Sequence, residues 1–353
     1  MRKLIRYLFL RPIRWLVVRL SSNPDRTRVF EALSKLQVKI KTSQGKKGMV
    51  LPLDSANGRF IIFSDQHKGA KDGADDFQLA EPNYIAALNH YYSNNFHLIC
   101  LGDSEELWEN TLAQVKKHNR DSFETEKQFL SRHAFTKIFG NHDLEWEINP
   151  LAGNELRGIY DDDIVALEGI ILEGTISGKT LCIFCTHGHQ GDEQSDGNLF
   201  SKFFISKIWA PLQAYLHLNP NTPAYDVTLK TEHNKLMYEW SSDQKGMLLI
   251  TGHTHQPVFE SFTHFERLQR QKDNNLYKDI KPSYFNTGCC CFDDGDITGI
   301  EIVDGYIKLI KWESTNGIAI RVELESTTLA KLADKLNEPS IPIPKPFVTT
   351  GNL

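Results

Sequence analysis

Five short apolar runs in this chain are each followed directly by Asp, Asn or His. The runs span residues 60–64, 97–101, 135–139, 181–186 and 247–251, and each has the length of a buried strand. The polar blocks after them are Asp65-Gln66-His67, Gly102-Asp103, Gly140-Asn141-His142-Asp143, His187-Gly188-His189 and Gly252-His253-Thr254-His255. Because the carboxyl ends of strands in an α/β sheet are where sites collect, the five blocks predict one shared site. The pattern therefore favours an α/β fold whose loops carry the chemistry.

The residue types in these blocks are those of a divalent metal site. A single pair such as His253 and His255 would be weak support, because paired histidines are often surface or packing residues. Mixed carboxylate, carboxamide and imidazole ligands suit Mn, Fe or Zn, and the absence of cysteine from the blocks argues against a structural zinc site. Two such ions about 3.5–4 Å apart can clamp a phosphoryl group for in-line attack. We therefore expect two divalent metal ions and a hydrolase.

In their order, the blocks D-x-H, G-D-x-x-E, G-N-H-D, H-G-H and G-H-T-H resemble those of the calcineurin-like metallophosphoesterase superfamily. The resemblance implies a fold of two packed mixed β-sheets flanked by helices, an α/β sandwich. It also implies a role for each site residue. Asp65, His67 and His255 would hold the first ion; Asn141, His187 and His253 would hold the second; Asp103 would bridge the two; His142 would stabilise the phosphoryl oxygens or act as general acid; and Glu106 would orient His142.

Several of these residues have a structural alternative. Asn141 could cap a turn, and Asp103 could be the N-cap of a following helix. His189 and Asp192 neighbour the fourth block without needing to touch metal, and we expect Asp143 to brace its loop. The turn Asn286-Thr287-Gly288 should lie under the site in a structural role.

The substrate is open at this level. Trp108, two residues after Glu106, completes a G-D-x-x-E-x-W pattern that resembles the UDP-2,3-diacylglucosamine pyrophosphohydrolases of lipid A synthesis. The chain departs from that group at His142, where Arg is typical, and at His189, where Asp is typical. That substrate therefore remains an alternative to a general phosphate ester or pyrophosphate. A non-catalytic metal-binding scaffold is a further alternative, although such members of the superfamily lack some of the residues that are all present in this chain.

Composition narrows the partners and the compartment. The net charge of −5 argues against a general nucleic-acid binder, so we expect a phosphorylated small molecule or lipid as substrate. The six cysteines include the run Cys289-Cys290-Cys291, which we interpret as strand packing rather than a disulfide framework. Cys182-x-x-Cys185 lies in an apolar run and is also interpreted as packing. These observations favour a reducing compartment and a cytoplasmic location.

The segments outside the blocks divide the chain. Residues 1–48 form a basic amphipathic helical extension, residues 49–326 the metallophosphoesterase domain with a helical insertion at 191–246, and residues 327–353 a helix with a Pro-rich tail. No apolar run in the extension approaches the roughly 20 residues needed to cross a bilayer. Its helix could lie on an anionic membrane surface, at the inner face of the membrane, or pack on the domain. The insertion could be a helical pair on the core or a cap over the site, and we favour the cap.

Local patterns predict further elements. Helices are expected at Asp25–Lys41, Pro82–Tyr92, Glu105–His118, His233–Trp240 and Thr328–Leu336. One strand is expected at Ile164–Ile171, and others at Tyr284–Asn286, Gly299–Val303 and Tyr306–Trp312, the last two joined by the turn Asp304-Gly305.

Overall fold

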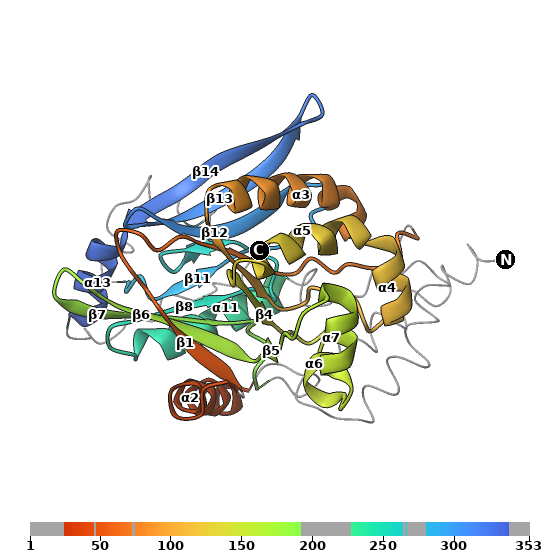
Figure 1. Ribbon diagram of the computed structural model, residues 1–353. Helices are drawn as coiled ribbons and strands as arrows, with labels where there is room; N and C mark the ends of the chain where they lie inside the picture. The colour runs from red at the N-terminus through yellow and green to blue at the C-terminus, as the bar shows by residue number, and fades with distance from the viewer. Residues whose placement is uncertain are drawn as a thin grey trace, which may run out of the picture.

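The chain folds around two packed β-sheets, as expected. The computed structural model describes residues 25–45, 47–72, 75–191, 227–263, 266 and 280–338. Within these ranges each sheet has seven strands (Figure 1). In order, the first sheet contains β1 (Gly48–Pro52), β6 (Gly169–Ile176), β7 (Lys179–Thr186), β8 (Met247–Thr251), β11 (Tyr284–Asn286), β9 (Val258–Phe259) and β10 (Phe262–Thr263). The second contains β14 (Ile318–Thr328), β13 (Tyr306–Thr315), β12 (Ile297–Val303), β2 (Phe60–Phe63), β3 (His97–Leu101), β4 (Phe135–Ile138) and β5 (Ala166–Leu167).

The main hydrophobic core lies between the two sheets. Ile62 and Ile99 from the second sheet pack in one cluster with Ile183 and Leu248 from the first. β2 and β8 are buried at every residue, which suits strands that are covered on both faces. Burial of each such side chain contributes about 1.5–3 kcal/mol.

Helices cover the outer faces. α3 (Phe77–Ser93) and α5 (Arg120–Leu130) lie on the second sheet, and α4 (Leu112–His118), α6 (Glu145–Ile148) and α7 (Ala152–Tyr160) form a smaller cluster beside it. α2 (Arg26–Thr42) and α11 (Val227–Ser242) lie on the first sheet. α13 (Leu329–Asn337) places four side chains in the main core between the sheets.

Parallel neighbours bring the predicted blocks to one edge. β2, β3 and β4 are parallel, with Phe63 beside Cys100 and Leu101 beside Ile138. β7 and β8 are parallel in the other sheet, with Cys185 beside Ile250. All five strands therefore end close to one another, and each ends where a polar block begins.

α2 matches the helix expected at Asp25–Lys41. The carboxylate of Asp25 caps it by accepting the backbone N–H of Arg28 at 2.9 Å. Val29, Leu33, Leu36 and Ile40 are buried on one face against the first sheet. The helix therefore contributes one face to the core of the first sheet.

Three expectations were wrong in detail. The strand expected at Ile164–Ile171 is split, because β5 pairs with β4 in one sheet and β6 begins at Gly169 in the other. The helix expected from Glu105 begins only at Leu112, where Thr111 forms a capping box with Gln114. α3 begins at Phe77, so Pro82 lies inside it. β14 was not expected at all.

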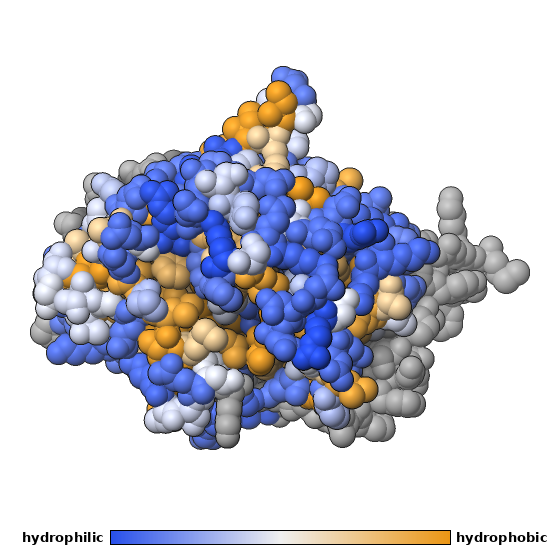
Figure 2. Space-filling view, in the orientation of Figure 1, coloured by the Kyte–Doolittle hydropathy of each residue, from blue (hydrophilic) through white to orange (hydrophobic). Residues whose placement is uncertain are grey.

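β14 and β13 form a hairpin that projects beyond the sandwich. Figure 2 shows apolar residues along one side of the projection, below a hydrophilic tip. Ile318 is 67 % exposed and Ile320 is 41 % exposed. The turn Asp304-Gly305, expected between β12 and β13, is present with both residues at positive φ.

The basic segment 1–24, most of the insertion (192–226) and the Pro-rich tail (339–353) lie outside the described residues. Among the residues described, no helix combines the length and the apolarity that a bilayer crossing requires.

Candidate metal centre

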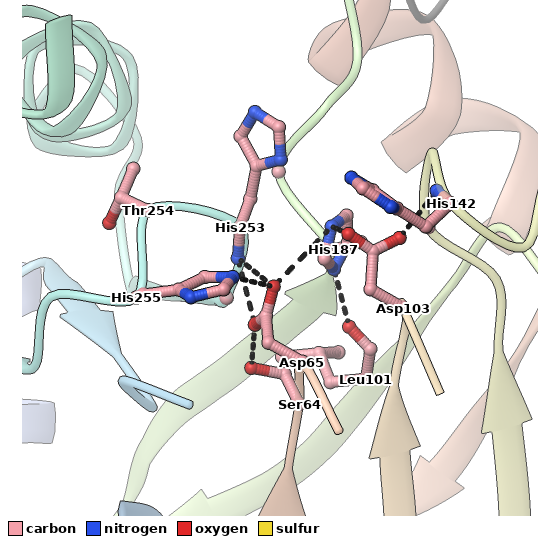
Figure 3. A network of polar contacts seen from close by, with 12 residues as sticks. Ser64, Asp65, Leu101, Asp103, His142, His187, His253, Thr254 and His255 are labelled. Carbon is pink, nitrogen blue, oxygen red and sulfur yellow. Dashed lines mark hydrogen bonds and ion pairs between the residues drawn. The ribbon is translucent and has the colours of Figure 1, made fainter. Parts of the chain in front are cut away.

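The five predicted blocks meet in one buried cluster (Figure 3). Backbone hydrogen bonds join their loops: Asp65 N–H donates to Gly102 O at 3.0 Å, and His67 N–H donates to Asp103 O at 2.9 Å. In the other sheet, Gly252 N–H donates to the carbonyl of His187 at 3.0 Å. His253 N–H crosses between the sheets and donates to the Asp65 carboxylate at 3.0 Å. The cluster is therefore fixed by main chain as well as side chains.

Five of the proposed ligands have left-handed backbone conformations. Their φ values are 53° at Asp65, 50° at His67, 50° at Asp103, 68° at His253 and 54° at His255. A non-glycine residue in this region costs on the order of 1 kcal/mol or more, and such residues cluster at functional sites. The surrounding fold holds all five in this conformation, which points their side chains to a common centre.

One set of ligand atoms surrounds Asp65. The Nε2 atom of His255 lies 3.2 Å from Asp65 Oδ1, and the Nε2 atom of His67 lies 3.9 Å from it. The two imidazole nitrogens are 3.2 Å apart. These are the three residues expected at the first metal position, and their donor atoms face one another.

A second set surrounds the other side of Asp103. Asp103, His187 and His253 each offer one ligand atom within 4.8 Å of the others. Asp103 Oδ2 lies 3.1 Å from His187 Nε2 and 3.9 Å from His67 Nε2. The carboxylate of Asp103 therefore lies between the two sets, which is the place expected of a bridging ligand.

The donor chemistry fits divalent cations. Asn141 is buried, and its Oδ1 atom accepts no hydrogen bond from the residues that the structure describes. A buried carbonyl oxygen without a donor is costly unless something else binds it. His187 Nδ1 is 2.9 Å from the carbonyl of Leu101, which leaves Nε2 as the ligand nitrogen. These oxygen and nitrogen atoms are suited to Mn, Fe or Zn.

The carboxylates favour positive charge at the cluster. Although burial opposes ionisation, His187 and His142 hold the pKa of Asp103 well below its usual value. Burial also opposes charge on His187, but the carboxylates of Asp103 and Asp65 raise its pKa to about 9. The pKa of His67 is raised to about 9 against its burial by Glu106 and Asp103. Metal binding should therefore displace protons from these nitrogens.

His142 is held on three sides at the edge of the cluster. Its Nδ1 atom is 2.6 Å from Glu106 Oε2, and its backbone N–H donates to Asp103 Oδ1 at 2.8 Å. The ring of Trp108 stacks on it, with centroids 4.0 Å apart and planes at 17°. Glu106 Oε2 is also 2.9 Å from His67 Nδ1, so one carboxylate positions both rings. Burial opposes ionisation of Glu106, but these two histidines lower its pKa to about 2.

Two glycines allow the loops to approach this closely. A Cβ atom at Gly140 would collide with the carboxylate of Asp103, and one at Gly252 would collide with Ser64 and Asp65. Both glycines directly precede ligand-bearing residues, so the sequence spacing of the third and fifth blocks has a steric cause.

The residues expected in supporting roles are found in them. Asp143 accepts Ser104 N–H at 2.8 Å and Gly140 N–H at 2.5 Å, so it braces two loops. Asn286 Nδ2 donates to the carbonyl of Gly252 at 2.6 Å, and Thr287 N–H donates to that of Thr251 at 2.9 Å. The turn after β11 thus supports the fifth block from below.

Two residues of α11 that were not predicted as site residues also contact the cluster. His233 Nε2 is 2.7 Å from the carbonyl of Gly188, and its ring centroid is 5.0 Å from that of His253. Asn234 accepts the hydroxyl of Thr254 at 3.1 Å. Two polar residues on the buried face of this helix were the signal that could have placed it against the site.

His189 is buried close to the cluster, with its ring centroid 5.5 Å from that of His187. Burial and the charge of His187 lower its pKa to about 3, so its ring stays neutral. It belongs to none of the candidate metal groups among the described residues. Asp192, the other less secure candidate, lies outside those residues.

The cysteines are all buried and free of disulfides. Cys182 and Cys185 lie in β7, as expected for packing residues. The interpretation of Cys289-Cys290-Cys291 as strand residues was wrong, because they lie in the loop between β11 and β12. That loop passes the cluster, and Cys290 N–H donates to the carbonyl of Asp65 at 3.1 Å.

A buried set of charges lies beneath the first three blocks. Lys68, Glu105, Glu126 and Lys137 have side chains that are fully buried. Lys137 Nζ is 2.8 Å from Glu105 Oε2, and Trp146 Nε1 donates to the same atom at 2.8 Å. Lys68 Nζ is 2.7 Å from Glu126 Oε1, an ion pair rather than a directed hydrogen bond. These ion pairs join the loops that carry Lys68 and Glu105 to β4 and α5.

No protein-family model matches the chain, and no curated protein matches its sequence. Among solved structures, Vps29 from Cryptosporidium parvum is 11% identical, with 77% of this chain and 99% of that chain covered and a TM-score of 0.35. A single mutant of Vps29 from Entamoeba histolytica is 14% identical, with 76% and 99% covered and a TM-score of 0.29. Likeness at this level establishes neither a shared fold nor a shared function.

Proposed function

We propose that this chain is a dinuclear, metal-dependent hydrolase of phosphate esters or pyrophosphates. The observation that carries the proposal is the position of Asp103 between two sets of ligands. Its Oδ2 atom lies 3.1 Å from His187 Nε2 on one side and 3.9 Å from His67 Nε2 on the other. A buried carboxylate placed in this way can be shared by two cations.

The two sets of residues would hold one ion each. Asp65, His67 and His255 would hold the first; Asn141, His187 and His253 would hold the second; and Asp103 would contact both. When bound, two divalent ions supply Lewis acidity that polarises a phosphoryl group and activates water for in-line attack.

His142 is the residue that we assign to the phosphoryl oxygens or the leaving group. Its Nδ1 atom is engaged by Glu106, so Nε2 is left for the substrate. Glu106 fixes the orientation of the ring, so that Nε2 can donate a proton to the departing oxygen. Trp108 keeps the ring from turning out of this position by stacking on it.

Hydrolysis assays of the manganese-reconstituted protein test the proposal. Asp103→Asn should abolish turnover because the amide carries no charge to share between cations. His142→Asn should lower turnover by roughly 100-fold or more, as loss of a proton donor does. Asp163→Asn and His133→Asn are matched controls at exposed positions and should retain activity. Full activity in Asp103→Asn would contradict the assigned role.

The substrate class is the finer part of the proposal. p-Nitrophenyl phosphate, bis-p-nitrophenyl phosphate and a UDP-sugar lipid separate monoester, diester and pyrophosphate hydrolysis. Hydrolysis of the UDP-sugar lipid alone would favour an enzyme like the UDP-2,3-diacylglucosamine pyrophosphohydrolases. A protein that binds metal but hydrolyses none of the three would instead favour the scaffold alternative. A phosphorylated lipid would also agree with a peripheral position at the inner face of the membrane, held by the basic segment 1–24.

A further inference from the structure

His255 has sulfur on the side of its ring that faces away from the first metal position. Its Nε2 atom is directed at Asp65 Oδ1, 3.2 Å away, while its Nδ1 atom lies 3.7 Å from the Sγ atom of Cys291. Cys289 also interacts with the His255 ring and with the thiol of Cys291. The His255 ring therefore lies between the Asp65 carboxylate and the thiols of Cys289 and Cys291.

Main-chain hydrogen bonds hold the loop that carries the thiols. Cys290 N–H donates to the carbonyl of Asp65 at 3.1 Å, and the carbonyl of Cys289 accepts Thr298 N–H at 3.0 Å. Cys289 is 1 % exposed and Cys291 is 6 % exposed. The loop is thus fixed both to the first block and to β12, which sets the backbone positions of Cys289 and Cys291 beside the His255 ring.

The directions of the two ring nitrogens decide what the sulfur does. His67, His255 and Cys291 offer ligand atoms within 4.8 Å of one another, so Cys291 could in principle be a ligand itself. However, Nε2 of His255 faces Asp65 and His67, whereas Nδ1 faces the sulfur of Cys291. The two nitrogens point in different directions from the imidazole ring. Cys291 Sγ therefore contacts Nδ1 of His255, the nitrogen that would not bind the metal ion.

We propose that Cys291, supported by Cys289, is a positioning residue that accepts the Nδ1–H of His255 and so directs Nε2 at the first metal ion. A histidine ligand usually donates its other N–H to a carboxylate, a backbone carbonyl or water, and loss of that partner typically weakens metal binding by about 10- to 100-fold. Here a thiol takes that place. The inference rests on the proposed metal centre and adds to it a residue outside the ligand set.

Calorimetric titration of the metal-free protein with Mn²⁺ tests the role without measuring turnover. Cys291→Ala should weaken one of the two binding events, the one at the site of His255, by about 10-fold or more and leave the other unchanged. Cys291→Ser should recover part of the lost affinity, because a hydroxyl also accepts an N–H. Cys290→Ala is the matched control: Cys290 lies in the same loop and is also buried, but its Sγ atom faces the carbonyl of Thr298 at 4.0 Å. It should bind Mn²⁺ as the wild type does.

The outcomes separate this inference from the proposed function. If the wild type binds no Mn²⁺, the metal centre itself is wrong. If the wild type binds two ions and Cys291→Ala binds them equally well, or if Cys291→Ser recovers nothing, the positioning role is wrong while the metal centre stands. A sulfur-to-metal charge-transfer band in the cobalt-substituted wild type, absent from Cys291→Ala, would make Cys291 a ligand and overturn its role as the outer partner of His255.

Discussion

Replacing Glu105 by Gln should destabilise the protein strongly, because this carboxylate is shared by two buried lysines. Lys137 Nζ is 2.8 Å from it and Lys68 Nζ is 3.9 Å from it, and all three side chains are fully buried. The variant keeps the size of the side chain, and Glu126 stays paired to Lys68. Lys137 is left without an ion-pair partner beyond the electrostatic influence of Asp143 and Glu126. Breaking a buried pair in this way costs about 3–5 kcal/mol, which is a large part of the roughly 5–15 kcal/mol that stabilises a domain.

Urea unfolding of the metal-free protein measures this loss. Lys137→Met introduced beside Glu105→Gln should recover part of the stability, since it removes the unpaired cation. Asp163→Asn is the control, because it breaks an exposed ion pair with Arg157. The Asp163 side chain is 74% exposed and that of Arg157 is 58% exposed. That pair should contribute less than about 1 kcal/mol.

The loss should also depend on pH. In the wild type, burial opposes charge on Lys137 but Glu105 raises its pKa, so its contribution to stability is complete below pH 10.5 and declines only above it. Without Glu105, burial should lower the pKa of this lysine below its unfolded value. Between the lowered pKa and pH 10.5, the unfolded chain then binds more protons than the folded chain does. The stability deficit of the variant should therefore shrink as the pH rises toward 10.5. A Glu105→Gln variant that unfolds within about 1 kcal/mol of the wild type at pH 7 would refute the reasoning.

Three further predictions concern the site and the N-terminus. Removal of metal by a chelator should lower the midpoint of thermal unfolding, and an ion at about 100 times its Kd should restore about 2.7 kcal/mol per site; an unchanged midpoint would contradict ligation in the folded state. Trp108→Ala should reduce kcat by roughly 10- to 100-fold with little change in KM, because the His142 ring loses its stacking partner and is misplaced for the reaction rather than for binding. If Trp108 only binds substrate, steady-state kinetics would instead show a raised KM with little change in kcat. Deletion of residues 1–24, which leaves α2 intact, should reduce sedimentation with anionic liposomes, since each basic residue near such a surface contributes about 1 kcal/mol; if full-length and truncated proteins both stay in the supernatant, the membrane interpretation is wrong.

The positions of the ligand blocks could be predicted because their signal is local. A buried apolar run such as residues 60–63, followed by Asp65 and His67, shows both a strand and its functional end in a few residues. Parallel pairing then brings the first three blocks together in one sheet and the last two in the other, and the packing of the two sheets joins the groups. The sandwich of two mixed sheets followed from the resemblance that those blocks carry.

The surroundings of the ligands could not be predicted because they depend on distant contacts. Glu105 and Glu106 belong to a stretch that looks helical, but one enters the buried charges and the other binds His142, so the chain stays in a loop. Lys68 gives no local sign that its partner is Glu126, which lies on α5. The cysteine run indicated burial correctly but could not show that Cys291 faces His255. In each case tertiary contacts outweigh local preference.

The stretch that became β14 shows a different limit. Ile318, Ile320 and Val322 alternate with other residues in the manner of a strand, yet the strand is largely exposed and carries charged residues beyond them. An exposed edge strand lacks the apolar run that identifies the central strands. Its pairing with β13 over the whole hairpin compensates for that weak local signal.

Anomalous diffraction from crystals of the manganese-reconstituted protein tests the central claim most directly. The account predicts two peaks on opposite sides of the Asp103 carboxylate, one beside Asp65 and one beside Asn141. A single peak, or peaks that Asp103 does not contact, would contradict it.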